Sequence, residues 1–173
     1  MQLETERLIL RDPEARDVED YLEICNSEFV LRYNAMTVKT REETLEQFRK
    51  DTRDGSTLVM ERKDTGKIIG AVFTGEDSLR YGIASKELSY FLGEDHTRQG
   101  YMKEALHAVI AHLFETEKLE CVAARVFAPN AASRKLLESL GFHLDGTVPR
   151  CVKGYRDVLY DDTLHSLFRE EFQ

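Results

Sequence analysis

The amino-acid sequence predicts an α/β fold arranged as one domain over residues 1–173. Apolar residues make up 42% of the chain, which is enough for one sizeable core. The second half alternates β-rich runs with helical stretches, in the order strand, polar turn with glycine, helix, strand and helix. We see no internal repeat and no linker-like segment, so we expect a single core.

The first half is expected to hold an opening strand, two helices and a β-hairpin. Apolar residues at helical spacing indicate the first helix, and a capping box with Thr40 as N-cap and Glu43 three positions on opens the second. The turn Lys63–Gly66 lies between two β-rich runs and is typical of a hairpin. The expected elements are a strand including Leu3 and Arg7–Arg11, a helix over Glu14–Asn26, an irregular segment over Ser27–Lys39, a helix from Thr40 to about Asp51, and strands over Ser56–Arg62 and Lys67–Thr74.

The second half is expected to contain a long amphipathic helix after Gly100 and a shorter one that ends at Gly141, a residue typical of helix C-termini. The run Thr163–Phe172 fits a strand or a helix equally well. The other expected elements are a polar stretch over Gly75–Ser85, strands over Lys86–Leu92 and Cys121–Ala128, a helix over Ala131–Leu140, a segment over Phe142–Asp145, a turn at Gly146, and a hairpin from Val148–Val152 to Asp157–Tyr160.

Composition excludes several classes of function. A net charge of −8 argues against direct nucleic-acid binding, which needs a basic face. The three cysteines are scattered and have no CxxC spacing, and the histidines have no HExxH spacing, so we expect reduced thiols and no metal. We see no cationic leader and no apolar run long enough to cross a bilayer, so we expect a cytoplasmic protein without a membrane partner.

One glycine lies where a polar turn enters the long helix, in the stretch RQGYMKEAL. The first N–H groups of a helix have no intrahelical partner, and the helix dipole makes this end attractive to anions. The simpler interpretation is that Gly100 only eases the turn. Neither GxxxxGK[ST] nor GxGxxG is present, so ATP and dinucleotides are disfavoured. The candidate phosphate donors are the backbone groups of Arg98, Gln99, Gly100, Tyr101, Met102 and Lys103, with the Arg98 cation beside them.

A second cluster, NAASRKLLESLGF, begins directly after a strand. Asn130 there can be a simple N-cap and Gly141 a simple helix stop. The spacing from SYFL to RQGYMKEAL to this cluster is more specific than any one motif. Together with ETERLILR, GKIIGAV and KGYRDVLYDDTL, these motifs resemble the GNAT superfamily of acetyl-CoA-dependent N-acetyltransferases over nearly the whole chain, most closely the Rim-type branch of ribosomal-protein N-terminal acetyltransferases. Of the family's loop pattern, only the central glycine is kept between Thr97 and Met102.

The resemblance implies the acyl-CoA N-acyltransferase fold, a mixed and largely antiparallel sheet of about seven strands flanked by helices. Two neighbouring strands would splay to form the coenzyme cleft. The pantetheine arm of acetyl-CoA would pair with the backbone of Tyr90, Phe91 and Leu92, where an N–H would polarise the thioester carbonyl. Asn130 would bond the pantetheine amides from the other side of the cleft.

Two catalytic residues are candidates. Glu87, on the strand entering the cleft, could be the general base, or equally a solvent-facing strand residue. Many members of the family have a tyrosine acid where this chain has Leu137, and the resemblance implies Ser133 as the proton donor instead. A first-turn serine can also simply bond to backbone.

The sequence thus predicts an enzyme that transfers acetyl from acetyl-CoA to a primary amine, either a protein N-terminal α-amine or a small-molecule amine. The alternatives are a catalytically silent acyl-CoA-binding module and another phosphate-ligand enzyme. The acceptor pocket should lie among the early helices, Ser27–Lys39 and Arg150–Tyr155, with Tyr33 and Asn34 in its wall. Monomer and homodimer both stay open.

Overall fold

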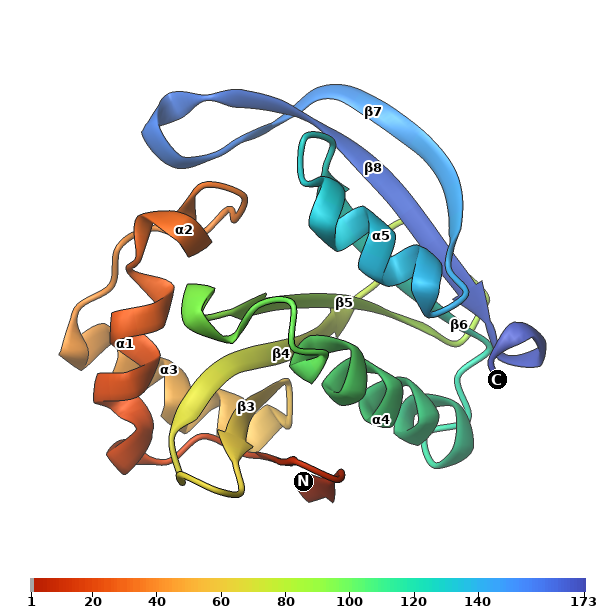
Figure 1. Cartoon of the computed structure of the whole chain (residues 1–173). Helices are drawn as coiled ribbons and strands as arrows, with labels where there is room; N and C mark the ends of the chain where they lie inside the picture. The colour runs from red at the N-terminus through yellow and green to blue at the C-terminus, as the bar shows by residue number, and fades with distance from the viewer. Residues whose placement is uncertain (1) are drawn as a thin grey trace.

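A computed structural model describes residues 2–173, which form one sheet with helices on both faces (Figure 1). Within this range the sheet has eight strands in the order β1-β2-β3-β4-β5-β6-β8-β7, and only the β5–β6 pair is parallel. The strands are β1 (Gln2–Glu4), β2 (Leu8–Arg11), β3 (Thr57–Arg62), β4 (Ile68–Glu76), β5 (Ser85–Leu92), β6 (Cys121–Phe127), β7 (His143–Lys153) and β8 (Leu159–Phe168). The α-helices are α1 (Val18–Cys25), α2 (Glu28–Leu31), α3 (Arg41–Asp54), α4 (Tyr101–Glu115) and α5 (Ala131–Ser139). Short 3-10 turns are η1 (Ala15–Asp17), η2 (Glu94–His96), η3 (Tyr155–Asp157) and η4 (Arg169–Glu171).

Alternating strand residues feed two separate cores on opposite faces of the sheet. On β3, Leu58 and Met60 pack with α4 and α5, whereas Val59 packs with α1 and α3. On β5, Leu88 belongs to the α4 face and Phe91 to the α1 face. This is the period of two expected for a strand that is covered on both sides. The face of any β5 side chain therefore follows from its position.

The two central strands, β5 and β6, separate part-way along their length. Their pairing begins at Ser85 and Cys121 and ends at Leu88 and Ala124. Beyond that point β5 continues against β4 as far as Leu92, and β6 continues against β8. The β6-side edge of residues 89–92 is therefore left without a strand partner, as the resemblance implied.

Most expected elements are confirmed, and the differences have local causes. The expected opening strand is two strands, because the chain reverses between β1 and β2 and pairs Leu3 with Leu10. The described sheet therefore has eight strands where about seven were expected. The segment expected to be irregular holds α2, whose N-cap Ser27 accepts a bond from the Val30 N–H. Gly146 lies at a register shift inside β7 and makes no turn. The undecided final run is a strand as far as Phe168.

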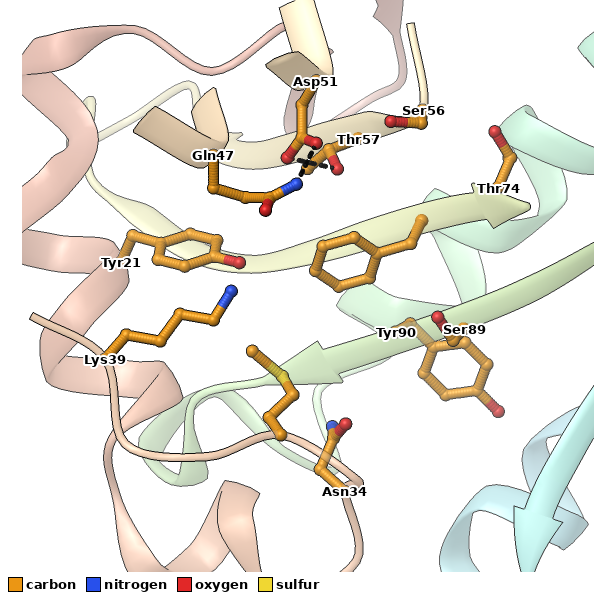
Figure 2. Close-up of a pocket in the computed structure, with 12 residues that line it drawn as sticks. Tyr21, Asn34, Lys39, Gln47, Asp51, Ser56, Thr57, Thr74, Ser89 and Tyr90 are labelled. Atoms are coloured by element: carbon orange, nitrogen blue, oxygen red, sulfur yellow. Dashed lines mark hydrogen bonds between the residues drawn. The ribbon is translucent and has the colours of Figure 1, made fainter. Parts of the chain in front are cut away.

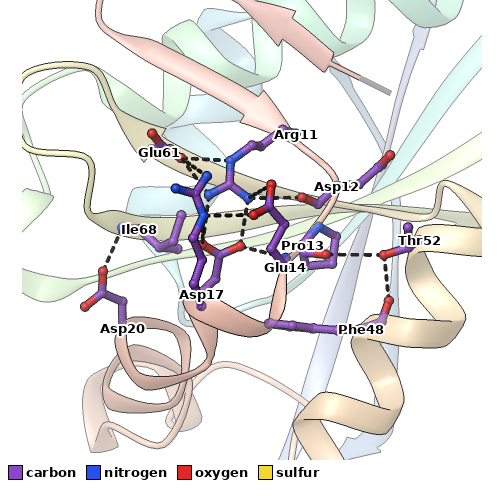
Figure 3. A network of polar contacts seen from close by, with 11 residues as sticks. Arg11, Asp12, Pro13, Glu14, Asp17, Asp20, Phe48, Thr52, Glu61 and Ile68 are labelled. Atoms are coloured by element: carbon purple, nitrogen blue, oxygen red, sulfur yellow. Dashed lines mark hydrogen bonds and ion pairs between the residues drawn. The ribbon is translucent and has the colours of Figure 1, made fainter.

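A buried ionic cluster joins α1 to the sheet (Figure 3). Arg11 of β2 makes a bidentate contact with Asp17, at 2.7 and 2.8 Å, and its Nε donates to Glu61 of β3 at 2.8 Å. Asp17 also accepts from the Glu14 N–H at 2.7 Å. Hydrogen bonding to Asp17 raises the pKa of Arg11, which keeps it charged. This cluster fixes the start of α1 over β2 and β3.

Candidate active site

The entry to α4 presents bare main chain. Arg98 and Gly100 both have left-handed φ, 60° and 84°, and the first intrahelical bond runs from Glu104 N–H to the Gly100 carbonyl at 3.0 Å. Among residues 2–173, no acceptor is bonded to the backbone N–H groups of residues 98–103. Successive N–H groups in such a turn make a concave anion site at the positive end of a helix. The geometry suits a diphosphate.

Two side chains at the start of α4, those of Tyr101 and Met102, are buried in the core and leave the bare amides uncovered. Met102 is only 6% exposed and packs in the α4 core, so it does not crowd the space outside the turn. Tyr101 is also buried, and the Arg7 guanidinium lies 4.3 Å from the centre of its ring. Arg7 in turn donates to the Gln99 carbonyl at 2.8 Å and pairs with Glu104 at 2.7 Å. Arg7 thus brings a second cation beside Arg98, which no local pattern in the sequence indicates.

The unpaired end of β5 faces the start of α5. The Tyr90 hydroxyl and Ser133 Oγ lie 2.6 Å apart, and the Ser133 N–H donates to Asn130 Oδ1 at 3.2 Å. Asn130 is therefore the N-cap of α5, and the Ser133 hydroxyl is bonded to a phenol rather than to backbone. Burial raises the pKa of Tyr90 to about 12, with the Ser133 bond opposing it. Leu137 is fully buried in the core, so the phenol nearest Ser133 comes from β5.

Carboxylates lie on the opposite face of β5. Glu87 is paired with Arg125 at 2.9 Å, and burial raises the pKa of Glu87 although Arg125 opposes the shift. Asp162 of β8 is 4% exposed, and its Oδ1 has no hydrogen-bond partner among residues 2–173. Burial likewise raises the pKa of Asp162, and Arg125 again opposes it. The sequence analysis did not single out Asp162, because this residue lies between the hairpin expected to end at Tyr160 and the undecided run from Thr163.

A pocket of about 360 Å³ opens on this same face, between α1, α3 and strands β3 to β5 (Figure 2). Most of its lining residues are polar, and the aromatic residues Tyr21 and Phe73 lie among them. The lining residues are Tyr21, Asn34, Met36, Lys39, Gln47, Asp51, Ser56, Thr57, Phe73, Thr74, Ser89 and Tyr90. Because Ser89 and Tyr90 lie where β5 leaves β6, the pocket adjoins the cleft between the two strands.

One of the three residues predicted to wall the acceptor pocket lines this pocket. Asn34 lines the pocket, whereas Tyr33 packs edge-on against Tyr160 of β8 at 6.0 Å. Arg156, at the end of the β7–β8 hairpin, pairs with Glu28 of α2 at 3.2 Å, and Figure 1 shows the hairpin reaching toward α2. Arg150 is exposed on β7 and is not among the lining residues.

The predicted site residues therefore fall into two groups. Residues 98–103, Tyr90, Asn130 and Ser133 gather around the α4 and α5 side of the cleft. Glu87 lies on the opposite face of β5, with the pocket. Cys25 and Cys121 are buried and Cys151 is exposed. Within residues 2–173 there is no group of three or more His, Cys, Asp or Glu side chains placed to hold a metal, and no helix long and apolar enough to span a membrane.

The family described as "Acetyltransferase (GNAT) domain" matches residues 7–143. This chain belongs to that family. The GNAT chain is 28% identical over 173 residues to the uncharacterized N-acetyltransferase YoaA of Bacillus subtilis, with 96% of both proteins covered.

Solved GNAT structures share the fold. An acetyltransferase of the GNAT family from Bacillus anthracis superimposes with a TM-score of 0.88 at 22% identity, covering 99% of this chain and 100% of that one. Mycobacterium smegmatis RimJ in complex with CoA-disulfide gives a TM-score of 0.81 at 20% identity, covering 96% and 88%. The resemblance to the GNAT superfamily is confirmed, and the chain is an acetyltransferase by family.

Proposed function

We propose that this enzyme transfers the acetyl group of acetyl-CoA to a primary amine, a protein N-terminal α-amine or a small-molecule amine, by direct attack in a ternary complex. Two features together carry the proposal: the backbone N–H groups at the α4 entry have no acceptor among residues 2–173, and the β6-side edge of β5 has no strand partner beyond Leu88. The first suits a diphosphate and the second suits an extended amide-containing arm, which are the two recognisable parts of coenzyme A.

Each predicted coenzyme residue has a role in this proposal. The N–H groups of residues 98–103 hold the diphosphate, with Arg98 and Arg7 adding positive charge. Residues 90–92 pair with the pantetheine arm through backbone groups, and Asn130 contacts it from α5. The RimJ neighbour contains CoA-disulfide, which supports coenzyme A as the ligand of this fold.

The thioester supplies an electrophilic acyl carbon when the coenzyme is bound. Only a neutral amine attacks it, so the nitrogen must be deprotonated first. At pH 7 this costs about 4–5 kcal/mol for a lysine-like amine and about 1–1.5 kcal/mol for an α-amine. Glu87 takes up that proton, directly or through water. Asp162 is the second candidate for the base, because burial raises its pKa, its Oδ1 has no hydrogen-bond partner among residues 2–173, and the charge of Arg125 acts on both carboxylates.

The departing sulfur needs a hydrogen-bond donor. As the C–N bond forms and the C–S bond breaks, the Ser133 hydroxyl donates to the sulfur, and the Tyr90 phenol donates to Ser133 in turn. Glu87 and Ser133 lie on opposite faces of β5, so the base reaches the amine from one face and the hydrogen-bond donor reaches the sulfur from the other. Starting from the neutral amine, the nitrogen loses one proton as the amide forms and the sulfur gains one as CoA leaves as a thiol, so the transfer itself is proton-neutral. Starting from the ammonium form, one further proton passes to the base and then to solvent.

Residues 1–173 act in this proposal as one cytoplasmic N-acetyltransferase domain, monomeric or homodimeric, without a metal and without direct nucleic-acid binding. The relative YoaA is named an N-acetyltransferase, which supports nitrogen as the acceptor atom.

A thiol-release assay with acetyl-CoA and a panel of peptides, amino acids and polyamines tests the proposal. We expect CoA release that depends on an amine, with a product heavier by one acetyl group. Tight CoA binding without turnover on any amine would instead indicate a silent binding module. Thermal protection by ATP or NAD, but not by coenzyme A, would indicate a different phosphate-ligand protein.

A further inference from the structure

The pocket beside the cleft contains a lysine, Lys39, that forms no ion pair within residues 2–173. Figure 2 shows the Lys39 side chain extending into the pocket, with its ammonium group toward the hydroxyl of Tyr21. Among residues 2–173, no carboxylate forms an ion pair with Lys39, whereas Lys50 of the neighbouring helix α3 is paired with Glu46 at 3.1 Å. The capping-box hydrogen bonds and, to a smaller extent, the charge of Lys39 lower the pKa of the exposed Glu43 on α3. A partly buried ammonium without a close ion pair nevertheless favours an anion supplied by a ligand.

The backbone of Lys39 is held in a fixed position. The side-chain amide of Asn26 donates to the Lys39 carbonyl at 2.9 Å and accepts from the Lys39 N–H at 2.9 Å. The next residue, Thr40, is the N-cap of α3, with both bonds of its capping box formed. The lysine therefore projects from a rigid point between α1 and α3, as a binding residue must.

The one carboxylate among the lining residues does not neutralise this lysine. Asp51 is 5% exposed, and its two oxygens accept from Gln47 Nε2 at 2.6 Å and from Thr57 Oγ1 at 2.9 Å (Figure 2). Tyr21 remains a neutral donor, because burial raises the pKa of its phenol. One end of the pocket thus offers an ammonium and a phenol, both suited to a carboxylate.

The opposite end of the pocket is formed by Ser89 and Tyr90, where β5 leaves β6. Under the proposed function this is where the acyl carbon lies. A molecule bound in the pocket would then hold its amine at Ser89 while its far end reaches Lys39. At about 360 Å³, the pocket is near the lower end of the size range of small-molecule sites.

We propose that the acceptor is a small amine that also carries a carboxylate, and that Lys39, with Tyr21, binds this carboxylate. The inference rests on the proposed function and narrows its acceptor. The transfer is then acetyl-CoA plus amino carboxylate giving N-acetylamino carboxylate plus CoA, with one C–N bond formed and one C–S bond broken. Lys39 binds the acceptor and takes no part in the bond changes.

The test compares kcat/KM for amino carboxylates with that for their carboxamides, which keep the amine and lose the charge. For the wild-type enzyme we expect at least a tenfold preference for the acids, within the range of a hydrogen bond to a charged group. Lys39→Gln should abolish this preference by lowering kcat/KM chiefly for the acids, with the KM for acetyl-CoA little changed. Lys39→Arg should keep most of the preference, and Lys50→Gln on the outer side of α3 should change nothing.

A binding measurement gives a readout independent of turnover. With CoA present, an N-acetylamino carboxylate should raise the melting temperature of the wild type more than its carboxamide does. For Lys39→Gln, the two ligands should raise the melting temperature equally and only slightly. Equal rates on acids and carboxamides would overturn the inference, as would an unchanged preference in Lys39→Gln. A clear preference for aminoalkyl phosphates, or for peptides over small amines, would also overturn it. If no amine at all were acetylated, the proposed function itself would fail.

Discussion

The two sides of the candidate active site differ in the groups they present, main-chain groups on one side and side chains on the other. The proposed coenzyme side consists of main-chain groups of residues 98–103 and 89–92, together with Asn130 and Ser133 at the start of α5. The acceptor side uses side chains that come from α1, α3, three strands and the segment before α3. Main-chain groups are present whatever the sequence, whereas a side-chain pocket changes with each substitution. The fold can therefore keep one coenzyme site while the acceptor changes.

The largest expected effect concerns the acceptor side, because a buried ionic cluster fixes α1 on the sheet. Arg11→Ala removes the buried cation that Asp17 and Glu61 share and leaves them only the exposed Arg16, at 4.0 and 3.7 Å, so it should lower the free energy of unfolding by about 3–5 kcal/mol. Urea unfolding followed by circular dichroism measures this loss.

Arg41→Ala is the matched control, since Arg41 of α3 pairs with Glu19 of α1 at 2.9 Å on the exposed surface. Such a pair contributes about 0–1 kcal/mol. Losses of equal size in the two variants would contradict a special role for the buried cluster.

The next largest effect should come from the sulfur's hydrogen-bond donor. Ser133→Ala should lower kcat by about 100-fold, the lower end for a group that acts in proton transfer, with little change in the KM for acetyl-CoA. Tyr90→Phe should lower kcat less, because the serine hydroxyl remains. Ser139→Ala, at the far end of α5, serves as control. Full activity in Ser133→Ala would exclude this serine as the donor.

A smaller effect is expected at Gly100. Its φ of 84° costs an L-residue about 1–2 kcal/mol, and an added Cβ would meet Arg7 Nη2 at 3.3 Å, beside the bare amides. Gly100→Ala should therefore weaken acetyl-CoA binding about tenfold, measured by calorimetry.

Gly55→Ala separates strain from binding. Gly55 has a φ of 63° and open space around it, at the C-terminus of α3. Gly55→Ala should lower the free energy of unfolding by about as much as Gly100→Ala does, with no change in coenzyme affinity. Equal affinity losses in both variants would contradict the predicted phosphate site.

The smallest effect is a pH-dependent change in stability at Asp162. Burial raises its pKa in the folded state, so folded protein binds this proton more tightly than unfolded protein does. The wild type therefore loses stability as pH rises from the unfolded pKa, near 3.9, through the raised folded value, and Asp162→Asn removes that loss. The melting temperature of the variant should exceed that of the wild type by a few degrees at pH 7, and by less near pH 4. A difference that does not vary with pH would contradict the raised pKa.

The caps and turns of the fold could be predicted from the sequence because local rules specify them. Thr40 and Asn130 are N-caps as expected, and Gly100 has the left-handed φ that only glycine adopts readily. The same local rules failed where a turn or short element left little signal, as with the reversal between β1 and β2, the four-residue helix α2 and the bulge at Gly146.

The long-range contacts on both sides of the site could not be predicted, because they join distant parts of the chain. Arg7 meets Gln99, Tyr90 meets Ser133, and Lys39 shares a pocket with Ser89, all across tens of residues. No spacing rule relates such pairs. Their proximity is set by the order of strands in the sheet and by the splay between β5 and β6.

A crystal structure of the enzyme with coenzyme A tests the central claim most directly. We expect the diphosphate oxygens at about 3 Å from the N–H groups of residues 98–103, with the pantetheine arm along residues 89–92 and the sulfur beside Ser133. A coenzyme bound elsewhere on the protein, or a diphosphate held by side chains while those N–H groups bond to the protein itself, would contradict the account.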